Sequence, residues 1–343
     1  MELIKADENG LSSEELEKIS ERLHGGAVVA IPTETVYGLA ADAMNQEAVK
    51  KIFEIKGRPS DNPLIVHISN MRMLNNLVSD FSNDAKKLIN AFWPGPLTLV
   101  LKKNREVPNI VTAGLDSVAV RMPSHKVALS IIECAKLPLA APSANLSGLP
   151  SPTMARHCVD DLGDKVDFIV DGGSCKVGLE STIILMTKKP YKILRTGIIT
   201  KSQIEGVIGA VETLQKHEEE SICSPGIKYR HYSPNAEVVL ISGGISEFTT
   251  QVNAVLDGSS CAMVFTGEKL DLDCMCLEYG GQFNSAELAH NLFAVLRKVD
   301  ELGFKRVFVR APSPHCAVYD RLTRAAGRES FGENKRIKRT TVF

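Results

Sequence analysis

Short apolar runs rich in β-branched residues recur along the chain and alternate with stretches of helical periodicity. In the first part of the chain such runs lie at 27–31, 63–68, 97–101, 118–122, 137–141, 168–170, 183–185 and 191–194. Runs of this length, bounded by Pro and Gly, are typical of buried strands. Apolar spacing predicts helices at 12–24, 45–56, 126–136 and 201–208. The pattern predicts an α/β fold.

The helix expected after Asn45 ends in a cationic loop. Gly57 suits a left-handed helix cap, and Pro59 prevents the helix from continuing. Lys56 and Arg58 are therefore expected at a loop. Two interpretations remain open: the cations complement the helix dipole, or they bind an anionic ligand.

Polar side chains also occur at the ends of predicted strands. Thr35 follows the strand 27–31, and His67 lies at the end of 63–68. Arg121 lies within the apolar run 118–122. Because burying an unpaired guanidinium is expensive, Arg121 either faces solvent from an edge strand or binds a carboxylate.

A loop of small polar residues, 142–148, follows the strand 137–141 and contains Ser143 and Asn145. It is a candidate phosphate or ribose cradle, although it has neither a GxxxxGK[ST] nor a GxGxxG pattern. Ser181 supplies a hydroxyl just before the strand 183–185. Arg195 follows another strand and either pairs with phosphate or lies exposed.

A polar, acidic stretch at 212–224 indicates a domain boundary. From residue 237, strands alternate with helices again, which predicts a parallel, Rossmann-like sheet. We therefore expect a first domain at 1–210, a linker at 211–235 and a second domain at 236–343. The linker contains Lys228, Tyr229, His231 and Tyr232. These side chains favour a lid over the active site, and packing of the tyrosines against either domain is the alternative.

Composition is that of an ordinary globular protein. The chain has 343 residues, of which 44% are hydrophobic and 24% charged, with a formal net charge of −1. This charge gives no general attraction to nucleic acid or membranes. No signal peptide or membrane span is expected. The eight cysteines lack zinc-finger spacing and are interpreted as free thiols in the cytoplasm, a metal site being the alternative. The basic run 335–339 is interpreted as a solvated end, with weak direct tRNA contact as the alternative.

Several motifs together resemble one family. PTETVYGL, KGRP, WPGPLT, VAVRMP, APSAN and LESTI occur in the order found in the YrdC-like family, and SPGIKYRHY followed by an α/β unit resembles its two-domain form. The resemblance implies a YrdC-like twisted open α/β sheet domain followed by a smaller Rossmann-like domain. It also implies L-threonylcarbamoyladenylate synthase activity. Such an enzyme condenses L-threonine, bicarbonate or CO2, and ATP to threonylcarbamoyl-AMP and pyrophosphate, for N6-threonylcarbamoyladenosine modification of tRNAs that read codons starting with A.

The resemblance also implies roles for individual residues. Lys56 and Arg58 would be catalytic, and the linker residues would form the lid. Threonine would be bound by Thr35, His67, Arg121, Ala141 and Ser181. ATP would be bound by Arg58, Asn62, Ser117, Ser143, Asn145, Ser151, Arg195 and Asn235. Mg²⁺ would come with ATP, and no metal site of the protein's own or tightly bound organic cofactor is implied.

The implied downstream partner is a tRNA threonylcarbamoyl transferase complex. Two rival functions remain: an RNA-binding module using the same cations, and a carbamoyl-transferase that uses a preformed donor. An aromatic content of 6% and the net charge of −1 speak against the first rival. Pyrophosphate release that requires both threonine and bicarbonate would distinguish the synthase from both.

Overall fold

The computed structural model describes residues 1–214 and 232–327. These residues form two compact units. The first contains Met1–Ser147 and continues from Ser151 to the described end at Leu214. The second contains Gly148–Pro150 and the described residues from Tyr232 onward. The three residues Gly148–Pro150 thus belong to the second unit, although the sequence on both sides of them belongs to the first.

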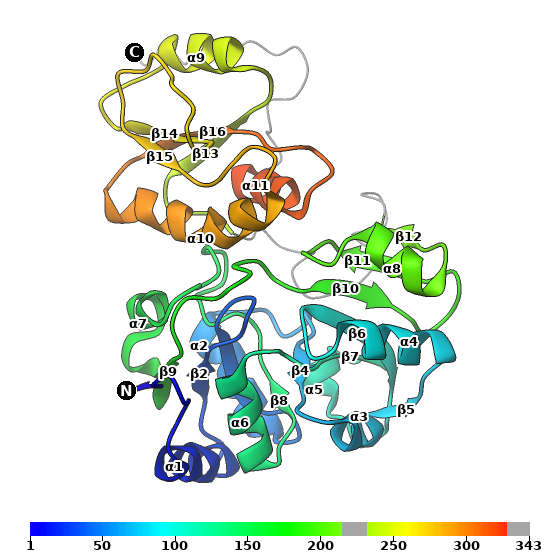
Figure 1. Cartoon of the computed structure of the whole chain (residues 1–343). Coiled ribbons are helices and arrows are strands. Elements are labelled where there is room, and N and C mark those ends of the chain that lie inside the picture. The colour runs from blue at the N-terminus through cyan, green and yellow to red at the C-terminus, as the bar shows by residue number, and fades with distance from the viewer. Residues whose placement is uncertain (215–231, 328–343) are drawn as a thin grey trace. The chain divides into compact units, whose positions relative to one another are not determined.

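A large mixed sheet runs through the first unit (Figure 1). In its described part the sheet has 12 strands in the order β1-β9-β2-β3-β8-β4-β7-β6-β10-β11-β12, with β5 paired to β6. The strands are β1 (Glu2–Lys5), β2 (Val29–Ile31), β3 (Gly38–Asp42), β4 (Ile65–His67), β5 (Val78–Asp80), β6 (Leu97–Lys103), β7 (Ser117–Arg121), β8 (Leu139–Ala140), β9 (Phe168–Asp171), β10 (Thr182–Leu185), β11 (Lys192–Arg195) and β12 (Glu212–Thr213).

The helices of the first unit begin and end where local sequence signals place them. Ser12 and Glu15 form a capping box at the start of α1 (Ser13–His24). The Asn45 side chain caps α2 (Gln46–Lys56), which ends at Gly57 with φ 59°. The other helices are α3 (Met71–Leu77), α4 (Asn83–Phe92), α5 (Asn109–Thr112), α6 (Lys126–Ala135), α7 (Ala155–Leu162), followed by a 3-10 turn (Gly163–Lys165), and α8 (Lys201–Ile208).

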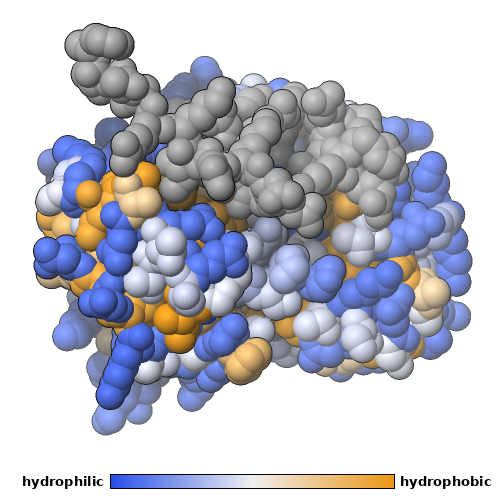
Figure 2. Space-filling model, turned by 90° about the horizontal axis from the view of Figure 1, so that it is seen from above, coloured by the Kyte–Doolittle hydropathy of each residue, from blue (hydrophilic) through white to orange (hydrophobic). Residues whose placement is uncertain are grey.

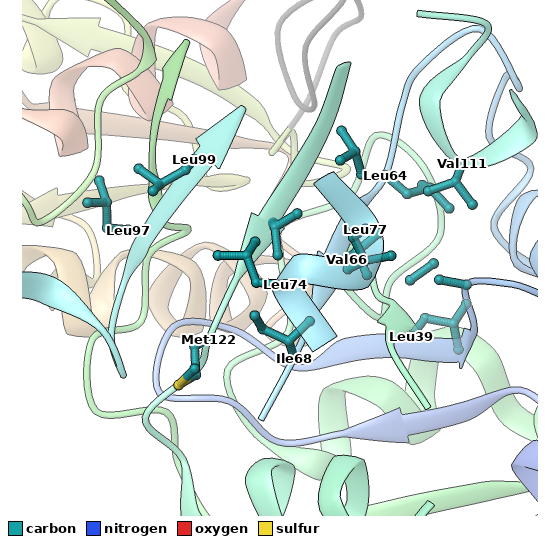
Figure 3. Packing of buried hydrophobic residues seen from close by; sticks show 14 of the residues in the cluster. Leu39, Leu64, Val66, Ile68, Leu74, Leu77, Leu97, Leu99, Val111 and Met122 are labelled. Carbon is teal, nitrogen blue, oxygen red and sulfur yellow. The ribbon is translucent and has the colours of Figure 1, made fainter. Parts of the chain in front are cut away.

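The first unit has two main apolar clusters. In one, Ile19 and Leu23 of α1 and Ile131 of α6 pack against strand residues such as Val29 and Leu139. The larger cluster joins the strands to α2, α3, α4 and α8. Figure 3 shows part of it, with Leu74 and Leu77 of α3 near Val66 of β4. Burial of these side chains is the main stabilising contribution to the unit.

A third, smaller cluster lies on the strands that carry the candidate site. Its members are Ile65 of β4, Ala119 of β7, Val100 of β6, Ile183 of β10 and Leu194 of β11. Ile65 and His67 are two residues apart in one strand, as are Ala119 and Arg121 in the next. Because side chains alternate along a strand, His67 and Arg121 lie on the same sheet face as this cluster.

The second unit contains a four-stranded sheet of order β13-β16-β14-β15, in which every described pair is parallel. Its elements are β13 (Glu237–Ile241), α9 (Ile245–Asn253), β14 (Ser260–Val264), β15 (Cys276–Glu278), α10 (Ser285–Glu301), β16 (Arg306–Arg310) and α11 (Ala317–Ala326). Within this unit Arg297 of α10 donates to the Pro150 carbonyl at 2.6 Å. The predicted Rossmann-like parallel sheet is confirmed.

The α/β prediction is also confirmed for the first unit, but several described elements of the chain have no counterpart in the sequence prediction, among them β1, β3, β5, α5, α7, β12 and β15. In the view of Figure 2, hydrophilic residues cover most of the visible described surface, and hydrophobic ones show in small patches. Among the described residues, no helix is both long and apolar enough to cross a membrane.

Candidate active site

Strands β4 and β7 bring the first two candidate residues together. They are parallel, and His67 pairs with Arg121 in their register. β7 lies between β4 and β6 in the interior of the sheet, and Arg121 is only 3% exposed. The interpretation of Arg121 as a solvent-facing residue on an edge strand is therefore wrong. Its guanidinium must be stabilised by partners within the protein.

Arg121 has three such partners. Its Nε donates to the Gly95 carbonyl at 3.1 Å, and Nη1 donates to Thr35 Oγ1 at 2.8 Å. Its Nη2 lies 2.5 Å from Glu34 Oε1 in a buried ion pair. A guanidinium has more N–H donors than these contacts use, so Arg121 retains the capacity to bind a further carboxylate.

The turn between β2 and β3 holds Thr35 against Arg121. Thr33 Oγ1 donates to the Val36 carbonyl at 2.6 Å and accepts from the backbone N–H groups of Thr35 and Val36. Such local hydroxyl bonds are the reason that Thr favours turns. The turn is buried, so the sequence Thr-Glu-Thr places all three side chains inside the molecule.

Several polar atoms of this arrangement are buried without a hydrogen-bond partner among the described residues: His67 Nδ1, both carboxylate oxygens of Glu34 and Arg121 Nη2. Both side-chain amide atoms of Asn62, which precedes β4, have the same status. Burial, followed by the positive charge of Arg121, lowers the pKa of His67 to about 3, so its imidazole is neutral at neutral pH. Buried polar atoms without partners are rare in folded proteins, and a polar ligand is one explanation for them.

The neighbouring strands bring Ser181 and Arg195 together. Ser181 Oγ is 2.7 Å from Thr98 Oγ1 on β6. Arg195 donates to the Ser181 carbonyl from Nε at 3.1 Å and to Ser181 Oγ from Nη2 at 3.2 Å. Arg195 is buried, so the alternative that it lies exposed is wrong. One residue from the predicted threonine set thus contacts one from the predicted ATP set.

The loop 142–147 is held by the last residue of α2. Lys56 is buried, and its Nζ donates to the carbonyls of Ser143 and of Asn145, the latter at 2.6 Å. Burial, followed by the charge of Arg58, lowers the pKa of Lys56. Lys56 is the last residue of α2, and its ammonium is directed inward to carbonyl groups that need a donor.

Three more of the predicted ATP residues, Arg58, Asn62 and Ser117, lie around the other end of β4 and β7. Arg58 donates to the carbonyl of Pro63 at 3.1 Å, just before β4. Ser117 begins β7, four residues before Arg121, which is about 13 Å along a strand. Ala141 N–H donates to the Ile65 carbonyl at 3.0 Å, so loop 142–147 leaves β8 toward this same end of β4.

The other two candidates have partners of their own. Ser151 Oγ donates to Glu180 Oε1 at 2.6 Å within the first unit. Asn235 lies in the second unit, where its side-chain amide and backbone N–H both contact Asp300 Oδ2. The roles assigned to these residues from the family resemblance stay predictions.

Of the predicted lid, Lys228, Tyr229 and His231 lie outside the described residues. Tyr232 is described and is buried in the second unit. Its ring stacks on Phe293 with centroids 5.3 Å apart, and the Arg321 guanidinium lies 5.4 Å from the ring centroid. These contacts agree with the alternative in which the linker's tyrosine packs against a domain.

Sequence reasoning missed three residues that the fold brings to the site: Glu34, Thr98 and Glu180. Glu34 carried a signal, because it lies in a hydroxyl-rich segment between two apolar strands. Its pairing with Arg121 joins positions 87 residues apart and is not visible in local sequence.

Comparison with known proteins decides the family. A family model described as "Telomere recombination", named for Sua5, YciO and YrdC, matches residues 21–197. A second, described as "Threonylcarbamoyl-AMP synthase, C-terminal domain", matches residues 199–327. Threonylcarbamoyl-AMP synthase of Pyrococcus abyssi is 42% identical over 313 residues, which cover 88% of this chain and 91% of that protein. The chain belongs to the threonylcarbamoyl-AMP synthase family.

Two further relatives agree with this membership. Threonylcarbamoyl-AMP synthase of Bacillus subtilis is 42% identical over 336 residues, covering 94% of this chain and 95% of that protein. The crystal structure of P. abyssi Sua5 complexed with L-threonine superposes with a TM-score of 0.88 at 39% identity, covering 95% of this chain and 98% of that one. The predicted two-domain family and synthase function are thereby confirmed at the level of the family, and neither rival function is favoured.

Proposed function

We propose that this chain condenses L-threonine, CO2 or bicarbonate, and ATP into threonylcarbamoyl-AMP and pyrophosphate. The observation that carries the proposal is the buried Arg121 at the end of β7, surrounded by Thr35, Glu34 and the unpartnered Nδ1 of neutral His67. A guanidinium with spare donors suits a carboxylate, and buried hydroxyl and imidazole groups suit a small polar side chain. Threonine has both.

A dry pocket favours the first chemical step. The amine of threonine must be neutral to attack the carbon of CO2, and desolvation disfavours its ammonium form. The walls are suitable, because Arg121, His67 and Thr35 are all almost completely buried. The attack forms a C–N bond and gives the carbamate after loss of a proton from nitrogen.

The second step joins the carbamate to the nucleotide. A carbamate oxygen attacks the α-phosphorus of ATP, an O–P bond forms, and the bond to the leaving pyrophosphate breaks. The carbamate is itself an anionic nucleophile, so positioning and charge stabilisation are the main requirements. Arg195 supports both, since it contacts Ser181 of the threonine set. Lys56 supports the step through loop 142–147, whose carbonyls it holds.

Mg²⁺ is expected to arrive as the counter-ion of ATP. In the described part of the chain, no group of three or more His, Cys, Asp or Glu side chains could hold a metal ion. Mg²⁺ in nucleotide sites is usually held by one or two carboxylates together with the substrate phosphates.

The product is a reactive mixed anhydride and therefore calls for a nearby acceptor system. We assign that role to a tRNA threonylcarbamoyl transferase complex. The cytoplasm is the proposed location, supported by the thiols of Cys134, Cys175, Cys261, Cys274, Cys276 and Cys316, which form no disulfide among the described residues.

Pyrophosphate release tests the function directly. The full chain is incubated with ATP and Mg²⁺, with L-threonine and bicarbonate each added or withheld. Release only in the presence of both is the expected result. Release without threonine would indicate another acceptor or a plain ATPase, and no release from the folded chain would contradict the proposal.

A further inference from the structure

Glu34 stands at the centre of the site without a role in the chemistry described so far. Its carboxylate is buried in the turn between β2 and β3, and Oε1 forms the ion pair with Arg121 Nη2 at 2.5 Å. The second oxygen, Oε2, is equally buried and has no hydrogen-bond partner in the described part of the chain. A buried carboxylate oxygen without a donor is expensive, so this oxygen needs an explanation.

The second unit contains a buried Arg–Glu pair for comparison. Glu268 accepts from Arg310 on both oxygens, at 2.8–3.2 Å, and Oε2 also accepts from the backbone N–H of Phe265 at 3.2 Å. This pair thus uses both carboxylate oxygens in hydrogen bonds. In the Arg121–Glu34 pair, Oε1 contacts Nη2 only as an ion pair, and among the described residues neither Glu34 oxygen accepts a hydrogen bond, although the guanidinium has spare donors.

The other groups near Glu34 do not supply the missing donor. Cys175 and His125 are the titratable neighbours besides Arg121, from the segments after β9 and before α6. Burial, followed by the negative charge of Glu34, raises the pKa of the Cys175 thiol. Burial lowers the pKa of His125, and there the Glu34 charge acts in the opposite direction. Neither side chain donates to Oε2. The position beside Oε2 therefore suits a cationic donor brought by a ligand.

An α-amino acid matches the Arg121–Glu34 pair in charge. Its carboxylate would face the spare donors of Arg121, and its ammonium, two bonds away from the carboxylate carbon, would face Glu34 Oε2. The amino acid and the Arg121–Glu34 pair would then lie side by side with opposite charges facing each other. In a site of low dielectric constant, the carboxylate–guanidinium and ammonium–carboxylate attractions are both strong. A ligand that lacked the ammonium would leave the Glu34 oxygen unsatisfied, which makes Glu34 a determinant of specificity as well.

We propose that Glu34 Oε2 accepts a hydrogen bond from the α-ammonium of threonine and removes its proton. This rests on the function proposed above. One N–H bond breaks, one O–H bond forms on Oε2, and the electron pair stays on nitrogen, where it is available to attack the carbon of CO2. Glu34 returns this proton to solvent before the next turnover, and the second proton, which nitrogen loses after the C–N bond forms, passes to water, so the step releases two protons in all. Glu34 is thus the general base of the first step.

The first test separates contact with the ammonium from support of Arg121. Binding of L-threonine and of 2,3-dihydroxybutyrate, in which a hydroxyl replaces the amine, is measured by calorimetry on the full chain and on Glu34→Gln. Glu34→Gln is expected to bind threonine about 10- to 100-fold more weakly, the range for a lost charged hydrogen bond. Its binding of the hydroxy acid should be weakened far less. Equal weakening of both ligands would mean that Glu34 only holds Arg121, and would overturn the proposal.

The second test addresses the proton. At saturating substrates, Glu34→Gln is expected to lose at least about 100-fold in turnover, the usual contribution of a general base. Its kcat/KM for threonine should rise about tenfold per pH unit below the pKa of the free amine, because it depends on amine already neutral in solution. Glu34→Asp, which keeps the charge, should recover part of the turnover. Wild-type turnover and an unchanged pH profile in Glu34→Gln would overturn the proposal.

A matched control and the order of measurements keep the outcomes distinct. Glu268→Gln makes the same chemical change in the buried pair of the second unit and should leave threonine binding and turnover unchanged. If the wild-type chain releases no pyrophosphate with threonine and bicarbonate, the proposed function itself fails. If it does, and Glu34→Gln is folded and behaves as Glu268→Gln does, only the role of Glu34 fails.

Discussion

At the residue scale, the candidate site is made of side chains that are costly to bury. Glu34, His67 and Arg121 are 5%, 3% and 3% exposed, although charged and titratable residues are mostly found at the surface. Arg121 and Glu34 reduce each other's cost as an ion pair, and burial, followed by the charge of Arg121, lowers the pKa of His67 so that it is buried neutral. The polar atoms left over are the ones a ligand would satisfy, which ties the local energetics to binding.

Single residues were predictable from the sequence to different degrees. Arg121 stood out because an arginine in an apolar strand demands a partner. Lys56 was recognised as a cation at a helix end, but its carbonyl partners could not be predicted, since they lie 87 and 89 residues away. The identity of such partners depends on the tertiary structure and cannot be derived from local patterns.

The depressed pKa of His67 predicts a pH-dependent loss of stability. In the unfolded chain a histidine takes up a proton below about pH 6.5, whereas folded His67 does so only near pH 3. Acid therefore favours the unfolded state, and stability falls by about 1.4 kcal/mol per pH unit below 6.5 from this group alone. Above that pH the group has no effect on stability.

Urea unfolding at pH 7 and pH 5 measures this contribution. Between pH 7 and pH 5 the free energy of unfolding of the wild-type chain should fall by about 2 kcal/mol more than that of His67→Gln, because glutamine at position 67 takes up no proton. Equal losses in the two chains would show that His67 titrates normally in the folded protein.

At the element scale, strand ends and the loops that follow them build the site. β4 and β7 were recognised from apolar runs, and their parallel pairing places His67 beside Arg121. β3 was missed, because Gly38–Asp42 consists of small residues with low strand propensity. It is a strand because β2 and β8 pair with it on both sides. An added Cβ at Gly38 would lie 3.2 Å from Ala141 Cβ, so the close approach of these segments also favours glycine.

The hydrogen bonds from Lys56 of α2 to the carbonyls of loop 142–147 give a prediction at this scale. Lys56→Met keeps most of the buried aliphatic volume but removes the donor for two carbonyls, at a cost of about 1–3 kcal/mol for the unsatisfied groups. The loop should shift, and ATP affinity should fall roughly tenfold or more. Threonine affinity should be nearly unchanged, because the Arg121 contacts lie on other elements. Calorimetric titration with each substrate measures both.

Lys51 is the matched control on the same helix. Its Nζ also donates to a backbone carbonyl, that of Gly26 at 2.7 Å, but the residue is exposed and away from loop 142–147. Lys51→Met should leave ATP affinity unchanged. If Lys56→Met behaved in the same way, loop 142–147 would not depend on Lys56 for its function.

At the scale of the whole molecule, the division of the chain into two units assigns Tyr232 to the second. Tyr232 is the first described residue after 215–231, and it has φ 66°, a left-handed conformation that is uncommon for a bulky side chain. Its ring is buried beside Phe293 and Arg321. Such a conformation persists only where packing fixes it, so Tyr232 is part of the core of the second unit.

Replacing Tyr232 should therefore destabilise the second unit selectively. Loss of a buried aromatic side chain costs about 3–5 kcal/mol, so Tyr232→Ala should lower protection in β13 and β16, while Tyr232→Phe, which keeps the ring, should have a much smaller effect. Native-state hydrogen exchange followed by mass spectrometry resolves the units separately. Exchange in β4 and β7 of the first unit should stay at the wild-type rate. If Tyr232→Ala left exchange in β13 and β16 unchanged and instead abolished product formation, the lid interpretation of this residue would replace the packing one.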